Sequence, residues 1–512
     1  MSDHLDPVTL AVLASALEGI SEEMGAVLIR AAYSSNIKER RDCSTALFDV
    51  EGQMVAQAEH IPVHLGAMPE AVAAVRDRAA KPGDVFVVND PYSGGTHLPD
   101  ITLVSALACE GELVGYAVTR AHHSDVGGMQ PGSMPSDSCE VYQEGLIIPP
   151  VRLVTAGGYV EDVLEFIVAN SRTPSLRRGD LRAQLAANRL AERRIQELID
   201  RRGLEIVLQA FEEVLTYTEK RTREMIKRLP DGSFGSHSEI EGDGTTDDDI
   251  PITATVEIEG DNLTVDFEGT AEAVAGNVNC PLSVTRSACY FALRVLLPSD
   301  VPPNAGVYAP VTIKAAEGSL VHATSPSAVV AGNVETSQRI ADTVLRALAE
   351  ATDLPAQGQG TMNNLIIGGP GWTYYETIGG GQGASSCGPG ASGVHVGMTN
   401  TLNTPIEALE LEYPMRVERY ELLYGSGGAG RHRGGDGLVR SVRVLEDASL
   451  SLLTDRRRHA PEGIEGGEDG RPGINRLGDD ELPAKAGAAL QAGDVVTLET
   501  PGGGGWGAEP EG

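Results

Sequence analysis

Glycine is concentrated toward the C-terminal end of the chain, where clusters of it alternate with short apolar runs. Of the 512 residues, 61 are glycine, and beyond Asn363 the clusters read GGPG, GGGQGA, CGPGASG, GSGGAG, RGGDG and PGGGGWG. A disordered tail would not keep returning to apolar runs, and glycine is the residue that tight turns favour. We therefore predict a glycine-rich β region with tight turns rather than a flexible extension.

The first half of the chain carries two clear helical patterns. Asp6 is a favourable N-cap, Pro7 suits the first helical position, and apolar residues between Leu10 and Ala31 recur every three or four positions. A second, highly charged helical stretch runs from about Ser175 to Arg228. Gly203 lies inside this stretch and is predicted to divide it into two helices.

Strand patterns surround these helices. One strand is predicted at Asp84–Asn89, and two more, Ala254–Ile258 and Leu263–Phe267, form a predicted hairpin around Gly260–Asn262. The expected fold class is therefore mixed α/β (α+β). We expect three regions in one unit: an N-terminal α/β region with a metal site (1–173), a charged helical segment (174–230) and a β-dominated, glycine-rich region (231–512).

The chain is strongly acidic, with 73 Asp and Glu against 40 Lys and Arg and a net charge of −33. Such a surface repels phosphate backbones and anionic lipids, so nucleic acid and membranes are not expected partners. Two interpretations of the excess acid stay open: ordinary solubility, and adaptation to a high-salt cytoplasm.

A cytoplasmic location is expected from three further observations. No uninterrupted apolar stretch approaches about 18 residues, the length that a membrane helix needs. The first residues, MSDHLDPVTL, lack the basic and apolar regions of a signal peptide. The six cysteines are scattered without a CxxC pair, which is typical of reduced thiols.

The stretch NDPYSGGTHLPDITLVSALACEGELVGYAVTRAHHSD, residues 89–125, carries the most informative chemistry. Two apolar strands flank Glu110-Gly111, and a two-residue hairpin turn there places Asp100 opposite Ala121, beside His122 and His97. Imidazole and carboxylate together suit divalent transition ions. Adjacent strand residues point to opposite faces, so the pattern favours His122 over His123 as the third ligand.

Other motifs give weaker or negative results. None of the six lysines follows a glycine, so no P-loop exists, and the GGGQGA cluster lacks dinucleotide-binding spacing. Asp247–Asp249 is interpreted as a solvated loop, and Asp42 on spacing alone as solvated or Arg-paired. Asp125 is either a carboxylate that orients a histidine or a turn cap, and His395 either a core-edge or a site residue.

Several segments resemble the hydantoinase B/oxoprolinase family. These segments span almost the whole chain in order: NIKERRDCSTALFD, HIPVHLGAMPEAV, NDPYSGGTHLPDITLV, RAHHSDVGG, YQEGLIIPPVRL, NSRTPSLRRGDLRAQ, PPNAGVY, AGNVETSQRIAD, GTMNNL, YYETIGGGQGA, TNTLNTPIEALE, SGGAGRHRGGDGLVR and PGGGGWG.

The resemblance implies a division of labour within a hetero-oligomer. A separate A-type subunit with an actin-like ATPase fold would bind ATP and phosphorylate the substrate. This chain would be the B-type subunit, holding a divalent metal (Zn, Mn or Fe) and completing the ring opening of a cyclic amide: a hydantoin, N-methylhydantoin, 5-oxoproline or lactam. Two alternatives are a subunit of an acetone- or acetophenone-type carboxylase, and a non-catalytic, metal-stabilised scaffold for the A-type subunit.

The resemblance also assigns residues. The family's metal ligands carry over to His97, Asp100 and His122, and Asp42 in the RRDCS segment carries over as a possible fourth ligand. We expect His123 or Asp125 to assist proton transfer.

Overall fold

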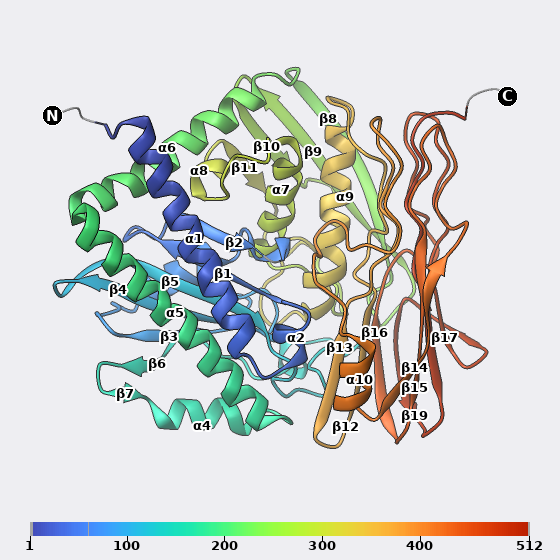
Figure 1. The fold of residues 1–512 in the computed structure, drawn as a ribbon. Helices are drawn as coiled ribbons and strands as arrows, with labels where there is room; N and C mark the ends of the chain where they lie inside the picture. Colours follow the sequence, from blue (N-terminus) through green and yellow to red (C-terminus); the bar gives the residue numbers. More distant parts are fainter. Residues whose placement is uncertain (1–3, 60, 510–512) are drawn as a thin grey trace.

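The computed structural model describes residues 4–59 and 61–509 (Figure 1). Within these residues the strands form four sheets, and helices lie against them, which confirms a mixed α/β fold. No helix among the described residues is long and apolar enough to cross a membrane.

The first sheet has seven strands in the order β2-β1-β5-β4-β3-β6-β7, and every neighbouring pair is antiparallel. Its strands are β1 (Cys43–Phe48), β2 (Met54–Glu59), β3 (Val85–Val88), β4 (Asp100–Cys109), β5 (Glu112–His122), β6 (Val151–Thr155) and β7 (Gly158–Tyr159). Helices α1 (Pro7–Ala31) and α5 (Pro174–Arg202) pack together over β1, β4 and β5 (Figure 1). The central strands are therefore buried on the face that these helices cover.

The helical predictions for this half are confirmed. The Asp6 side chain accepts hydrogen bonds from the backbone N–H groups of Val8 and Thr9, so Asp6 is the N-cap of α1. Gly203, with a φ of +89°, separates α5 from α6 (Leu204–Ile226). The shorter helices here are α2 (Ser35–Lys38), η1 (Pro62–His64), α3 (Met68–Arg76), η2 (Val141–Gln143) and α4 (Glu161–Ala169).

A four-stranded sheet follows, in the order β11-β10-β9-β8. It contains β8 (Gly232–Glu241), β9 (Asp249–Glu259), β10 (Asn262–Asp266) and β11 (Val311–Lys314). Asn262 pairs with Glu259, so the predicted hairpin is confirmed, with Gly260 and Asp261 as its turn. The helices of this part are α7 (Leu282–Leu296), α8 (Ala305–Tyr308), the π-helical turn η3 (Gly332–Thr336) and α9 (Ser337–Leu348), and α9 packs on β8 and β9.

The C-terminal part contains two packed sheets. One has the order β13-β12-β16-β19, and the other has the order β14-β15-β20-β17-β18. The elements are β12 (Asn364–Gly369), β13 (Trp372–Glu376), α10 (Ile406–Glu412), β14 (Met415–Leu423), β15 (Gly437–Val444), β16 (Ala448–Leu453), β17 (Ile474–Leu477), β18 (Asp480–Leu482), β19 (Lys485–Leu490) and β20 (Val495–Glu499). Apolar side chains of both sheets share one cluster, so the predicted β-rich region is a folded layer structure.

In several glycine clusters the glycines allow backbone segments to pack closely rather than forming tight turns. The prediction that these clusters are turns is therefore wrong for those segments. Gly371, with a φ of +82°, does turn the chain between β12 and β13. Gly434 and Gly503 serve a different purpose, since a Cβ on Gly434 would lie 2.0 Å from the Gly503 carbonyl oxygen and one on Gly503 would lie 2.1 Å from that of Gln382. Without Cβ atoms, loop segments approach closely enough to hydrogen-bond to one another, as Gly428 N–H does to Gly503 at 2.9 Å.

The largest apolar cluster joins residues of the first three sheets to residues of α7 and α9. It includes Phe48 of β1, Val256 of β9, Ile340 of α9 and Leu453 of β16. Segments from β1 to β16 therefore share one core, which brings the hairpin β4–β5 next to segments far along the sequence.

Candidate metal centre

The hairpin that carries the candidate ligands turns at Glu110 and Gly111, as the sequence predicts. Both residues have positive φ values, +52° and +89°, which two-residue hairpin turns of the primed type require. Cys109 pairs with Glu112 directly beside this turn, and Ala108 pairs with Leu113 next to them. The turn therefore sets β4 and β5 side by side with the expected local register.

Further along, the register differs from the prediction by one residue. Val114 is an extra residue in β5, a β-bulge that shifts the pairing beyond Ala108. Asp100 consequently faces His122 and not Ala121. The predicted neighbourhood is correct, and the bulge makes the pairing direct.

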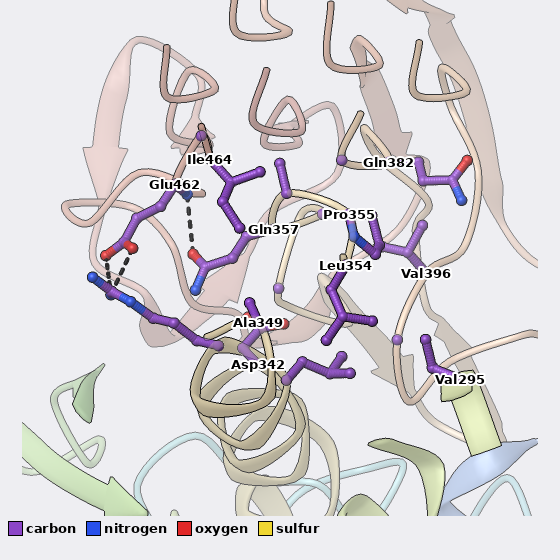
Figure 2. A pocket seen from close by; sticks show the side chains of 18 of the residues that line it. Val295, Asp342, Ala349, Leu354, Pro355, Gln357, Gln382, Val396, Glu462 and Ile464 are labelled. Carbon is purple, nitrogen blue, oxygen red and sulfur yellow. Dashed lines mark hydrogen bonds and ion pairs between the residues drawn. The ribbon is translucent and has the colours of Figure 1, made fainter. Parts of the chain in front are cut away.

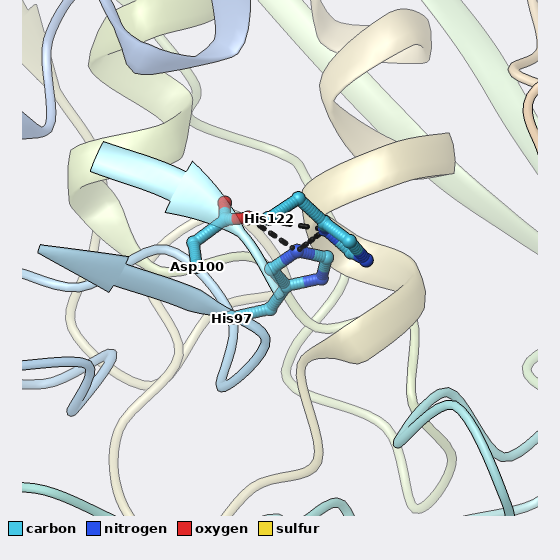
Figure 3. A group of neighbouring side chains, drawn as sticks. All are labelled: His97, Asp100 and His122. Carbon is cyan, nitrogen blue, oxygen red and sulfur yellow. Dashed lines mark hydrogen bonds and ion pairs between the residues drawn. The ribbon is translucent and has the colours of Figure 1, made fainter. Parts of the chain in front are cut away.

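His97, Asp100 and His122 are buried and point their polar atoms at one another (Figure 3). His97 Nε2 lies 3.1 Å from Asp100 Oδ1 and 3.2 Å from His122 Nδ1. His122 Nδ1 lies 3.1 Å from the same Asp100 oxygen. Two imidazole nitrogens and one carboxylate oxygen thus converge on a single point.

The donor set fits a divalent transition ion. Donor atoms about 2.1 Å from one ion, at angles of about 90–109°, lie about 3.0–3.4 Å apart. The observed separations of 3.1–3.2 Å fall in this range. Two histidines with one carboxylate is a ligand set that iron, manganese and zinc accept.

Burial and neighbouring charges shift the pKa values of these three residues in opposite directions. Burial alone would raise the pKa of Asp100, but the His97 charge and hydrogen bonds from His122, His64 and His97 hold it well below its usual value. Burial lowers the pKa of His122, whereas Asp100 outweighs burial at His97 and raises its pKa. The carboxylate is therefore ionised and available as a ligand near neutral pH.

His64 is a part of the site that sequence spacing did not identify. Its Nε2 lies 3.4 Å from Asp100 Oδ2, and its Nδ1 lies 2.9 Å from the Ser44 hydroxyl. Thr96 donates a hydrogen bond of 2.6 Å to the same Asp100 oxygen. His64 comes from η1, and no local pattern links it to the hairpin. The feature of the sequence that pointed to His64 was its position in HIPVHLG, which is part of a segment that carries the family resemblance.

The structure does not bring His123 and Asp125 into the group. His123 Nε2 lies 2.8 Å from Gln184 Oε1 on α5, on the opposite face of β5 from His122. Asp125 accepts hydrogen bonds from Arg172 and from the backbone of Gly132, so it organises the following loop. Proton transfer by either residue stays a prediction without a contact to the group.

Asp42 lies close by but outside the three-residue group. Its carboxylate faces Arg40 at 3.7 Å, and its backbone oxygen accepts the His122 N–H at 3.0 Å. The Arg40 guanidinium also lies 4.5 Å from the ring centre of Tyr375, and this ring stacks on His122 with centroids 4.5 Å apart. Asp42 as a fourth ligand stays a prediction.

A second His/carboxylate group lies on the surface. His459 Nε2 lies 3.0 Å from Asp249 Oδ2 and 3.4 Å from Glu239 Oε2. These side chains are 35–41% exposed, and Arg458 already neutralises Asp249. The Asp247–Asp249 segment is thus largely exposed with Asp249 ion-paired, and the buried group is the stronger metal candidate.

A cavity of about 850 Å³ lies beside α9 and the glycine-rich loops (Figure 2). Leu354 and Val396 line part of its wall, and Glu462 accepts a salt bridge from Arg346 at its edge. His395 lines the cavity too, and burial lowers its pKa to about 4. His395 is therefore neutral near pH 7, at the boundary between the cavity and the core.

The fold and the buried group define a protein with a hairpin-borne candidate centre for a divalent ion. The chain matches the hydantoinase B/oxoprolinase family over residues 6–509 and belongs to that family. It is 41% identical to an uncharacterised protein of Methanocaldococcus jannaschii, over 99% of this chain and 92% of that protein. It is 36% identical to the putative B-type subunit of a D-/L-hydantoinase from a Pseudomonas species, over 99% and 91%.

Other similarities come from longer proteins and from solved structures. The chain is 40% identical to 5-oxoprolinase 1 of Arabidopsis thaliana, but it spans only 42% of that protein. An ATP-dependent caprolactamase from Pseudomonas jessenii has the same fold, with a TM-score of 0.92, 31% identity and coverage of 98% of this chain and 91% of that one. Nucleotide-free acetone carboxylase shares the fold at 18% identity, with a TM-score of 0.90 and coverage of 98% and 76%.

Proposed function

We propose that this chain is the B-type subunit of an ATP-dependent cyclic amide hydrolase, with a divalent metal held by His97, Asp100 and His122. The observation that carries the proposal is the convergence of these three donor atoms within 3.2 Å in a buried site. The hydrolases among the relatives act on cyclic amides or are named for doing so, which supports this reaction class.

Each neighbour of the group would have a separate task in this reaction. A bound divalent ion would lower the pKa of water and polarise the activated carbonyl. Asp100 is held in place by Thr96 and His64 through its second oxygen, which leaves Oδ1 for the ion. Tyr375 fixes the ring of His122 by stacking. A partner A-type subunit would activate the amide with ATP, because this chain has no P-loop.

The test is to replace His97 with Ala and assay the reconstituted pair of subunits. We expect loss of ring opening and of bound metal, with the ATPase activity of the complex at least partly retained. Hydantoin, 5-oxoproline, a lactam and a ketone with bicarbonate are assayed side by side to find the substrate class. Unchanged ring opening in a protein without metal would contradict the proposal.

The same assay separates the alternatives. Consumption of the ketone that requires bicarbonate would identify a carboxylase subunit instead. Full activity in the His97 variant, together with metal in the native protein that survives a chelator, would identify a scaffold.

A further inference from the structure

Glu335 is a buried acidic residue that the proposed reaction leaves unexplained. It lies in η3, the π-helical turn that precedes α9, and it is 0% exposed. Single π turns inside helices are rare and often occur at functional sites. A buried carboxyl group is costly unless its environment uses it, so its contacts show what it does.

The Glu335 carboxyl group holds one amide side chain in a fixed orientation. Its Oε1 accepts hydrogen bonds from Asn364 Nδ2 at 3.0 Å and from the Met362 N–H at 3.2 Å. Asn364 Nδ2 also donates to the Leu453 carbonyl oxygen at 2.7 Å. With both of its N–H groups engaged in this way, Asn364 must turn its oxygen in the opposite direction.

That oxygen receives the hydroxyl group of Tyr375. The Tyr375 hydroxyl donates to Asn364 Oδ1 at 2.9 Å, and the Tyr375 ring stacks on His122 at an interplanar angle of 24°. Three consecutive contacts thus join Glu335 to one of the candidate ligands, across segments more than two hundred residues apart in the sequence.

We propose that Glu335 is a positioning residue for the candidate metal centre, and that it acts through Asn364 to hold the ring of Tyr375 against His122. The inference rests on the proposed function for the identity of the centre. Glu335 itself touches none of the three ligands, and its effect is to fix the plane of the His122 ring before any ion binds.

The surroundings of Glu335 match this role. Burial, together with the charge of Asp455, raises the pKa of Glu335 to about 7, although the charge of Lys485 opposes both effects. The charge of Glu335 also acts on Arg457, where it opposes the lowering of the guanidinium pKa by burial. The Oε1 atom of Glu335 accepts the two hydrogen bonds whether the carboxyl group is protonated or ionised, so the orientation of Asn364 is kept across neutral pH.

A double-mutant cycle tests the chain of contacts. Glu335→Ala removes the hydrogen bond from Asn364, and Tyr375→Phe removes the hydrogen bond to Asn364. Each variant should bind Mn²⁺ or Zn²⁺ about tenfold more weakly than the native protein. The double variant should bind the metal no more weakly than the weaker-binding single variant, because both substitutions interrupt the same series of contacts. Glu335→Gln keeps the accepting oxygen and should restore affinity to within about threefold of the native protein.

A second measurement needs no metal. The ring-proton NMR signal of His122 in the metal-free protein senses the stacked Tyr375 ring, so it should move in Glu335→Ala and keep its position in Glu335→Gln. The control is Asp180→Ala, which removes another buried carboxylate with two backbone N–H partners, Tyr33 and Ser34. It should lower the melting temperature without moving the His122 signal.

The outcomes are distinct. Additive losses in the double variant, or an unmoved His122 signal in Glu335→Ala, would overturn the inference. If the native protein binds no divalent ion, the proposed function fails, and the His122 signal still decides the role of Glu335. If Glu335→Ala does not fold, Asn364→Ala cuts the same path and replaces it in the cycle.

Discussion

Asp100 and His122 face each other across β4 and β5 because β5 contains one residue more than β4 between the turn and this pair. The extra residue is Val114. The pair Ala108–Leu113, which lies between Val114 and the turn, keeps the unshifted register, and every pair from Leu107–Gly115 onward is shifted by one residue. A one-residue change of register turns side chains to the other face of a strand, so this bulge decides which histidine meets Asp100.

Gly115, next to the bulge, is expected to tolerate no side chain. A Cβ there would lie 2.2 Å from the backbone oxygen of Phe48 in β1. We predict that Gly115→Ala lowers the free energy of unfolding by about 2–3 kcal/mol and weakens metal binding, because β1 and β5 must separate. Urea denaturation measures the loss. Gly235→Ala in β8, where a Cβ meets no atom within 4 Å, is the control and should be close to neutral.

Short-range sequence rules predicted part of this site, and the rest depends on contacts between distant segments. The turn at Glu110-Gly111 follows from a short-range rule and brings His122 to within one residue of facing Asp100. The alternation of faces places His122 on the side of Asp100 only in the bulged register. The bulge lies beside Gly115, where the backbone of β5 approaches Phe48 of another strand, and no local pattern records this contact. His64 and Tyr375 reach the group only through the tertiary fold.

The same reasoning applies to the rest of the fold. The helix α1 and the division at Gly203 depend on caps and periodicity within a few residues, and both are confirmed. The packed glycine segments depend on contacts between distant loops, as between Gly434 and Gly503, and glycine content alone suggested turns.

Metal binding should stabilise the native state. A ligand that binds only the folded protein adds about 2.7 kcal/mol at a concentration one hundred times its Kd. We therefore expect Mn²⁺ or Zn²⁺ to raise the Tm of chelator-treated protein and to leave that of Asp100→Asn unchanged. His459→Ala alters only the exposed group and should keep the rise. A rise that persists in Asp100→Asn and disappears in His459→Ala would place the ion at the surface.

His122 and His123 should differ sharply despite being adjacent. His122→Ala removes a candidate ligand and should reduce metal affinity by at least about a hundredfold. His123→Ala instead loses the contact with Gln184 on the other face, so stability should fall by about 1 kcal/mol with metal affinity nearly unchanged. Calorimetric titration of both variants with Zn²⁺ measures the contrast. Equal losses of affinity would mean that His123 belongs to the centre.

The stability of the metal-free protein should depend on Glu144 at mildly acidic pH. This residue is fully buried, and its Oε1 accepts hydrogen bonds from the Ser138 hydroxyl and from the N–H groups of Val329 and Val330. Burial raises its pKa from 4.5 to about 7. Because the folded state binds this proton more tightly, the contribution to stability is complete below pH 4.5 and is lost as the pH rises to about 7.

Glu144→Gln keeps the accepting oxygen but cannot ionise, so it should lack this loss. Relative to the native protein, we expect the variant to gain about 3 kcal/mol between pH 4.5 and pH 8, the equivalent of the pKa shift. Urea denaturation at pH 4.5, 6 and 8 gives the two curves. Glu192→Gln, on the exposed side of α5, should follow the native curve. Parallel curves for the native protein and Glu144→Gln would show that Glu144 stays ionised throughout this range, because its three hydrogen bonds then outweigh burial.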